Sequence, residues 1–216
     1  MTLNGSLLKI KNKFKFRENK LVVATHNNGK LNEIKDLLKD FNCKVYSSIG
    51  LNLPVPKENG STFEENALIK SSQTTELSGY ASLSDDSGLM IDALDGAPGI
   101  YSADWAGNSR NFNKAIEKID YLMRYKKDFN AKMVCVLCLT WSDKKFKLFK
   151  GEMKGTIQLP PRGKKGFGYD PIFIPSIQPF RNKLLTYGEI EPEFKNSNSH
   201  RNFAFNKLLD FITNDK

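Results

Sequence analysis

The chain has 216 residues, of which 39% are hydrophobic and 26% are charged, a balance typical of a soluble globular protein. No apolar run approaches the roughly 20 residues that a membrane span requires. Lysines interrupt the N-terminal segment, where a secretory signal would have its apolar core. We therefore expect a cytoplasmic protein with no membrane partner.

The net charge of +9 is unevenly distributed. Six basic residues and one acidic residue stand in residues 1–20, so this segment carries +5 and leaves +4 for the rest of the chain. We predict that residues 1–19 form a mobile basic extension and that residues 20–216 form a single domain. A strongly basic chain could also be a non-catalytic nucleic-acid-binding protein. The concentration of charge at one end argues against that class, and we expect no specific nucleic-acid partner.

Cys135 and Cys138 form a C-x-x-C pattern, which in other contexts indicates a redox or zinc site. They lie in an apolar run, residues 131–141, that predicts a buried strand. Side chains three positions apart on a strand point to opposite faces of the sheet, so the two sulfurs cannot share a ligand. The pattern therefore indicates two core cysteines.

The first predicted strand, residues 21–25, runs into a polar loop that contains Gly29, and a helix follows from Lys30. A loop between a strand and a helix N-terminus is a ready phosphate site, because free backbone N–H groups and the helix dipole attract an anion. Lys30 would add a positive charge. The segment alone fits an ordinary connection with a surface lysine equally well.

A second helix is predicted from Thr62 to about Ser78, where Gly79 ends it. Thr62 and Glu65 have the spacing of a capping box, in which each side chain satisfies the other's backbone N–H. This gives Glu65 a structural role, and we leave it out of any metal site. Lys70 lies in the middle of this helix.

A short strand, residues 80–84, is predicted to deliver Asp85 and Asp86 at its carboxyl end, before a turn at Ser87-Gly88. Adjacent carboxylates repel unless a cation lies between them, and a hard metal such as Mg²⁺ is the usual cation at such a site. An isolated Asp-Asp-Ser-Gly run would more simply be a solvated turn.

The second half of the chain predicts a helix over residues 111–125, the buried strand already described, and a more polar strand over residues 146–157. Residues 160–171 combine three glycines, three cations and two aromatic residues, which favours a binding loop over a flexible hairpin. Ser199 is a candidate N-cap for an apolar C-terminal helix.

Six motifs then occur in order: Thr25-His26-Asn27-Asn28-Gly29-Lys30, Thr62-Phe63-Glu64-Glu65-Asn66-Ala67, Ser84-Asp85-Asp86-Ser87-Gly88, Gly96-Ala97-Pro98-Gly99-Ile100-Tyr101-Ser102, Gly166-Phe167-Gly168-Tyr169-Asp170-Pro171 and Ser199-His200-Arg201. Together they closely resemble the inosine/xanthosine triphosphate pyrophosphatases, the Ham1-like dITP/XTP pyrophosphatase family, over about residues 20–213. The resemblance implies an elongated, two-lobed α/β fold with a long mixed central sheet, flanking helices and a cleft between the lobes. It also implies a homodimer.

The implied reaction is Mg²⁺-dependent hydrolysis of ITP, dITP and XTP to the monophosphate and pyrophosphate, which clears deaminated purines from the nucleotide pool. The resemblance assigns catalysis to Asp86, with Asp85 supporting the metal site and Lys70 binding phosphate. Glu58 matches a second metal ligand beside Asp86. The substrate-binding residues that it implies are Thr25, His26, Asn27, Asn28, Gly29 and Lys30 for the triphosphate, Ser87 beside it, and Phe167, Gly168, Tyr169, Asp170, Lys195, His200 and Arg201 for the base and sugar.

The runner-up is a related pyrophosphatase that acts on dTTP, UTP or modified pyrimidine nucleotides and has a similar fold. The Phe167–Asp170 and Ser199–Arg201 motifs favour the purine branch. Two positions depart from the usual pattern: Asp104 stands where relatives often have arginine, and Lys57 where a second acidic residue is common.

Overall fold

The computed structural model describes residues 18–39, 43–107 and 109–214. The predicted basic extension lies outside the described residues, apart from its last two positions. One of these, Glu18, accepts hydrogen bonds from the backbone N–H and the hydroxyl of Ser142, the latter at 2.6 Å. Among the described residues, no helix is long and apolar enough to cross a membrane.

Within the described residues, a six-stranded sheet runs the length of the molecule in the order β2-β1-β3-β4-β5-β6. β1 pairs in parallel with β2 and β3, and β3 to β6 pair antiparallel. The predicted mixed sheet is confirmed. The strands are β1 (Lys20–Ala24), β2 (Lys44–Ser47), β3 (Ala81–Ile91), β4 (Asn130–Thr140), β5 (Phe146–Ile157) and β6 (Phe173–Pro175).

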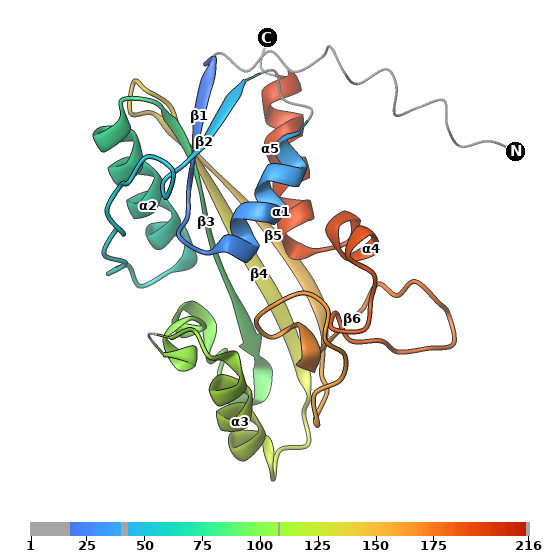
Figure 1. Ribbon diagram of the computed structural model, residues 1–216. Coiled ribbons are helices and arrows are strands. Elements are labelled where there is room, and N and C mark those ends of the chain that lie inside the picture. The colour runs from blue at the N-terminus through green and yellow to red at the C-terminus, as the bar shows by residue number, and fades with distance from the viewer. Residues whose placement is uncertain (1–17, 40–42, 108, 215–216) are drawn as a thin grey trace, which may run out of the picture.

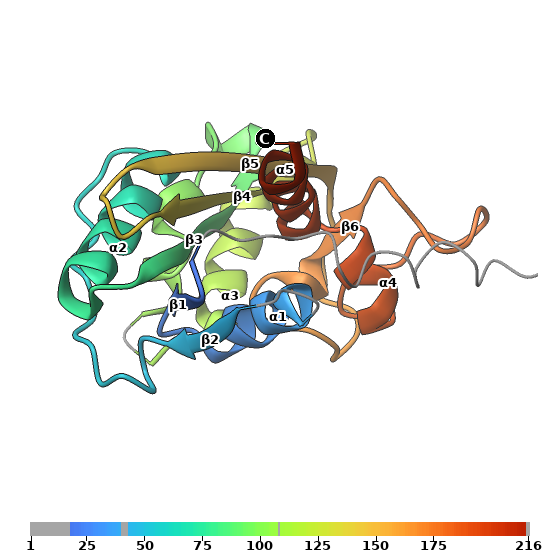
Figure 2. The same ribbon diagram turned by 90° about the horizontal axis from the view of Figure 1, so that it is seen from above.

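Helices flank this curled sheet on both faces (Figures 1 and 2). They are α1 (Asn28–Leu38), α2 (Phe63–Ser78), α3 (Phe112–Met123), α4 (Pro192–Ser197) and α5 (His200–Asn214). α1 and α5 pack on one face at one end of the sheet, and α2 packs on the opposite face. α3 packs at the other end, against the far halves of β3 and β4. The sheet therefore joins two lobes with separate apolar cores.

The alternation of side chains along β4 explains why both of its faces are apolar. Cys135 and Leu137 face α1 and α5, whereas Val136 and Cys138 face α2. The two cysteines lie on opposite faces as predicted, and both are buried core residues.

β3 is much longer than predicted, because the strand continues through the Asp-Asp-Ser-Gly run to Ile91. The predicted turn at Ser87-Gly88 was wrong: antiparallel pairing with β4 carries the strand past it. Gly88 serves close packing instead, since a Cβ there would lie only 2.3 Å from the carbonyl oxygen of Gly99. β1 ends at Ala24, opposite Ser84, so β3 has no parallel neighbour beyond that point. The carboxylates therefore lie beside a free strand edge.

The predicted helix ends are largely confirmed. Thr62 caps α2 by accepting the N–H of Glu65, and Gly79 ends the helix with φ 70°. The Glu65 carboxylate, however, accepts from the backbone N–H and hydroxyl of Ser61, one residue earlier than the capping box predicts. The Ser199 hydroxyl accepts the N–H of Asn202, which confirms it as a cap of α5.

Candidate active site

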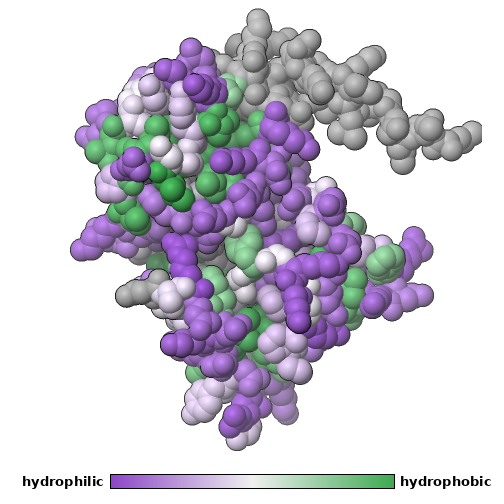
Figure 3. All heavy atoms as spheres, in the orientation of Figure 1, coloured by the Kyte–Doolittle hydropathy of each residue, from purple (hydrophilic) through white to green (hydrophobic). Residues whose placement is uncertain are grey.

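One cleft lies between the two lobes at the free edge of β3. Its walls come from the β1–α1 loop, α2, β3, residues 100–103 and 110–112, the 167–170 loop and the start of α5. On the face shown in Figure 3, the surface where the two lobes meet is largely hydrophilic. Every predicted site residue lines the cleft except Asn28 and Gly29.

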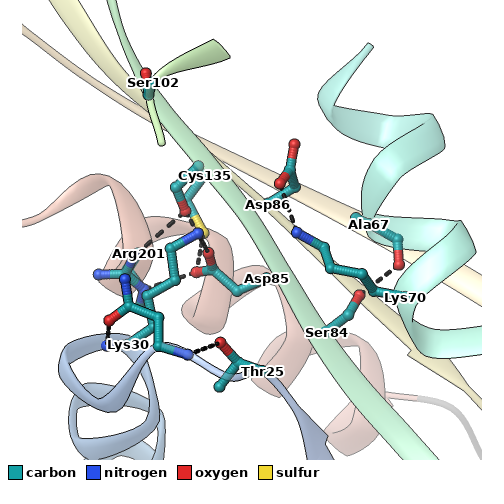
Figure 4. Close-up of polar contacts among 12 residues, drawn as sticks. Thr25, Lys30, Ala67, Lys70, Ser84, Asp85, Asp86, Ser102, Cys135 and Arg201 are labelled. Carbon is teal, nitrogen blue, oxygen red and sulfur yellow. Dashed lines mark hydrogen bonds and ion pairs between the residues drawn. The ribbon is translucent and has the colours of Figure 1, made fainter. Parts of the chain in front are cut away.

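Asp85 and Asp86 point away from each other across β3, as consecutive residues of a strand must (Figure 4). Asp85 faces α1 and α5, and Asp86 faces α2. Each carboxylate contacts cationic side chains of the protein, Lys30 and Arg201 at Asp85 and Lys70 at Asp86. These side chains offset the repulsion expected between the two neighbours, and metal binding at Asp86 stays a prediction.

Asp85 is a buried counter-ion. One of its oxygens lies 2.6 Å from Lys30 Nζ and the other accepts Arg201 Nε at 2.7 Å. The Ser87 hydroxyl and the Cys135 thiol also donate to it, at 2.5 and 3.2 Å. Burial opposes its ionisation, but the charges of Arg201 and Lys30 hold the pKa of Asp85 well below its usual range. Since all its lone pairs face partners, Asp85 organises the two cations.

Asp86 has the opposite electrostatic balance. Its Oδ1 accepts Lys70 Nζ at 2.6 Å, while its buried Oδ2 has no hydrogen-bond partner. Burial raises the pKa of Asp86 to about 6, even though Lys70 and Lys30 favour the ionised form. A carboxylate with a free oxygen and a pKa close to neutrality is suited to accept a proton or a cation.

Lys70 reaches this site from α2, whose inner face is unusually polar. Ser84 and Ser82 of β3 donate to the carbonyl oxygens of Ala67 and Ser71, both at 2.6 Å. These hydroxyl contacts replace much of the apolar packing expected between a helix and a sheet. They fix α2 on β3 and with it the position of Lys70 beside Asp86.

Glu58 and Asp86 are the residues that fit a hard divalent cation. Both contact Lys70, Glu58 at 3.0 Å, and the side chain of Glu58 is 42% exposed. Among the described residues, no group of three or more His, Cys, Asp and Glu side chains gathers into a metal cluster. Two carboxylates with one unpartnered oxygen match Mg²⁺, which commonly binds one or two carboxylates and takes its other ligands from water and substrate phosphates.

A chain of alternating charges runs from Asp85 to the far wall of the cleft. Arg201 contacts Glu33 of α1, Glu33 contacts Lys195 Nζ at 3.1 Å, and Lys195 contacts Asp170 at 2.6 Å. Burial opposes ionisation of Glu33, but Arg201 and Lys195 lower its pKa. Sequence reasoning missed Glu33; its position beside Ile34, on the buried side of a predicted helix, was the available signal.

The far wall is aromatic. The ring of Phe167 covers Gly29, where a Cβ would approach it to 2.9 Å, so Gly29 supports this ring instead of lining the cleft. Lys195 Nζ lies 4.8 Å from the centre of the same ring. Tyr169 donates to the carbonyl oxygen of Ser102 and meets Phe112 edge-on. Phe112, which sequence reasoning missed, joins this wall to α3.

The two histidines have different surroundings. His26 Nε2 donates to the carbonyl oxygen of Leu53 at 3.0 Å, which ties the β1–α1 loop to the irregular segment that carries Glu58. His200 is buried and its Nδ1 has no partner. Burial, and then Arg201 and Lys195, hold the pKa of His200 well below its usual value, so its imidazole is neutral at pH 7.

A long mixed sheet with a cleft lined by lysines, buried carboxylates and an aromatic wall defines a two-lobed, nucleotide-binding class of α/β protein. The chain belongs to the Ham1 family, whose model matches residues 21–211. The dITP/XTP pyrophosphatase of Bartonella quintana is 46% identical over 207 aligned positions, which cover 88% of this chain and 94% of that protein. That of Agrobacterium fabrum is 43% identical with the same coverage.

Solved structures agree with the predicted fold. A HAM1 protein from Coxiella burnetii superimposes with a TM-score of 0.80 at 35% identity, covering 90% of this chain and 98% of the other. The Ham1 protein of Staphylococcus aureus gives a TM-score of 0.79 at 36% identity, covering 91% of this chain and all of the other.

Isosteric substitutions should distinguish the catalytic role of Asp86 from the structural role of Asp85. Asp86→Asn should lower kcat at least about 100-fold, as loss of a general base typically does, and leave a folded protein. Asp85→Asn should lower the free energy of unfolding by about 3–5 kcal/mol, because it leaves Lys30 without its carboxylate partner and Arg201 with Glu33 alone. Denaturant unfolding and steady-state kinetics check both. Near-normal turnover of Asp86→Asn, or wild-type stability of Asp85→Asn, would refute these roles.

The ionisation of Asp86 can be measured directly. In metal-free protein, ¹³C NMR should show its carboxyl titrating near pH 6, because burial disfavours the charge. Added Mg²⁺ should shift this midpoint downward, since a bound cation favours the carboxylate. A metal-free midpoint below pH 4, or one that Mg²⁺ leaves unchanged, would show that the site differs from this description.

Proposed function

We propose that this chain hydrolyses the non-standard purine nucleoside triphosphates ITP, dITP and XTP to the monophosphate and pyrophosphate. The single observation that carries the proposal is the Asp86–Lys70–Glu58 group, with its unpartnered carboxylate oxygen, facing the same cleft as Lys30 and the start of α1. The Bartonella and Agrobacterium relatives, named dITP/XTP pyrophosphatases, support the substrate class.

The triphosphate would lie between α1 and α2. Asn27 caps α1 by accepting the N–H of Lys30, and Thr25 accepts the N–H of Asn27. These contacts hold the loop in shape beside the positive end of the helix dipole, which attracts phosphate. Lys30 and Lys70 would then contact phosphate oxygens from opposite faces of β3.

Asp86 is the group suited to accept the proton of the attacking water at the α-phosphorus. Its free Oδ2 is the available acceptor, and its pKa of about 6 leaves it mostly ionised at pH 7. Mg²⁺ bound by Asp86 and Glu58 would screen the phosphate charge. Lys70, held against both carboxylates, would stabilise the negative charge that develops during the reaction.

The base would lie on the aromatic wall, beside Phe167 and His200. Hypoxanthine and xanthine carry an oxygen at C6 that accepts hydrogen bonds, whereas adenine presents an amine there. Arg201 uses three of its five N–H groups, on Asp85, Glu33 and Ser87, and two remain for a substrate. A buried donor that meets the adenine amine costs about 1–3 kcal/mol, which favours the oxo-purines over ATP.

The homodimer and the cytoplasmic location stay predictions.

The reaction products provide the test. With Mg²⁺, ITP, dITP and XTP should each yield one pyrophosphate per monophosphate, EDTA should abolish turnover, and ATP should be a poor substrate. Ion-exchange chromatography separates pyrophosphate from phosphate. The same assay with dTTP and UTP tests the alternative that the protein prefers pyrimidine nucleotides. Release of inorganic phosphate with accumulation of the diphosphate, or preference for dTTP or UTP, would overturn the proposal.

A further inference from the structure

Most of the cationic side chains that line the cleft are already paired with carboxylates of the protein itself. Four of them, Lys30, Lys70, Lys195 and Arg201, are in contact with five carboxylates, those of Glu33, Glu58, Asp85, Asp86 and Asp170. With all of these groups ionised, the network carries one more negative charge than positive. The summed charge of these side chains therefore does not attract a triphosphate, and a net attraction has to come from the start of α1, from Mg²⁺ or from a further cationic side chain.

Arg110 is the remaining arginine or lysine that lines the cleft, and it differs from the other four. It is exposed, and no described carboxylate lies within ion-pair distance of it. Its charge is therefore available to a ligand. A guanidinium also matches phosphate geometry, because it can donate two parallel hydrogen bonds to phosphate oxygens.

Local backbone structure holds Arg110 in place. Its N–H donates to the carbonyl oxygen of Gly107 at 2.8 Å, and the next residue, Asn111, donates to Ala106 at 2.9 Å. Arg110 itself has φ 50°, which an arginine adopts only at a cost of about 1 kcal/mol or more. The turn ends where Asn111 caps α3, so Arg110 is fixed at the start of this helix.

Arg110 approaches the cleft from the lobe that carries α3. Two residues later, Phe112 packs edge-on against Tyr169, at 5.2 Å between ring centres, and this places the segment against the aromatic wall. Lys30 and Lys70 enter from α1 and α2 in the other lobe (Figures 1 and 4). A ligand between the lobes would therefore meet Arg110 on one side and the two lysines on the other.

We propose that Arg110 is a substrate-binding residue that contacts the anionic phosphates from the α3 lobe and adds a positive charge that no described carboxylate offsets. This inference rests on the proposed function for the identity of the anion. It gives the segment between β3 and α3 a direct role in binding, beyond packing against β3 at Gly88.

The test combines kinetics with a probe that needs no turnover. Arg110→Ala should lower kcat/KM for ITP about tenfold, mainly by raising KM. The kcat/KM of this variant should also depend less on ionic strength than that of the wild-type protein, because a charge that attracts the substrate has been removed. Inorganic pyrophosphate binding, measured by calorimetry with Mg²⁺ present, should weaken by a similar factor. Arg110→Lys should keep most of the wild-type kcat/KM for ITP and most of the pyrophosphate affinity. Lys114→Ala removes an exposed charge one turn along α3, outside the cleft, and should change neither.

Unchanged KM and unchanged pyrophosphate affinity in Arg110→Ala would overturn the inference. So would an equal loss in Lys114→Ala, which would indicate a general effect of surface charge. Failure of the proposed function is distinguishable, because wild-type protein would then not release pyrophosphate from ITP, while the calorimetric comparison of the variants would still report on Arg110.

Discussion

The rest of the site depends on the buried ion pair between Asp85 and Arg201. It joins the centre of β3 to the start of α5, and its charges continue to Lys30 on one side and through Glu33 to Lys195 and Asp170 on the other. Removing a member of this chain would take a partner from at least one buried or half-buried charge, which is costly. The alternating chain therefore fixes the relative positions of α1, α4, α5 and the aromatic wall.

Because consecutive side chains of a strand point to opposite faces of the sheet, the two adjacent aspartates have different surroundings and different roles. The side chain of Asp85 points into the ionic network, where cations lower its pKa; that of Asp86 points to α2, where burial raises it. The same pair of residues thus provides one carboxylate that holds the site together and one that is left free to react. Because β1 ends at Ala24, both lie at an edge of the sheet that a ligand can reach.

Much of this arrangement could be predicted from the sequence. The helix caps, the buried strand with its opposed cysteines, the mixed sheet and most cleft residues follow from local patterns and from the six motifs. The length of β3 could not be predicted, because its continuation depends on pairing with β4, some 50 residues later. Glu33 and Arg110 were missed for a similar reason: each stands in an ordinary helical or loop context, and only the fold brings it to the cleft.

A double-mutant cycle on Asp85→Asn and Arg201→Gln tests this central pair most directly, with the free energy of unfolding as the readout. The two losses of unfolding free energy should be strongly non-additive, with a coupling energy of about 2–3 kcal/mol, because either substitution alone already breaks the buried contact between Asp85 and Arg201. Additive losses within about 0.5 kcal/mol would contradict the account, since they would show that the two side chains contribute independently to the fold.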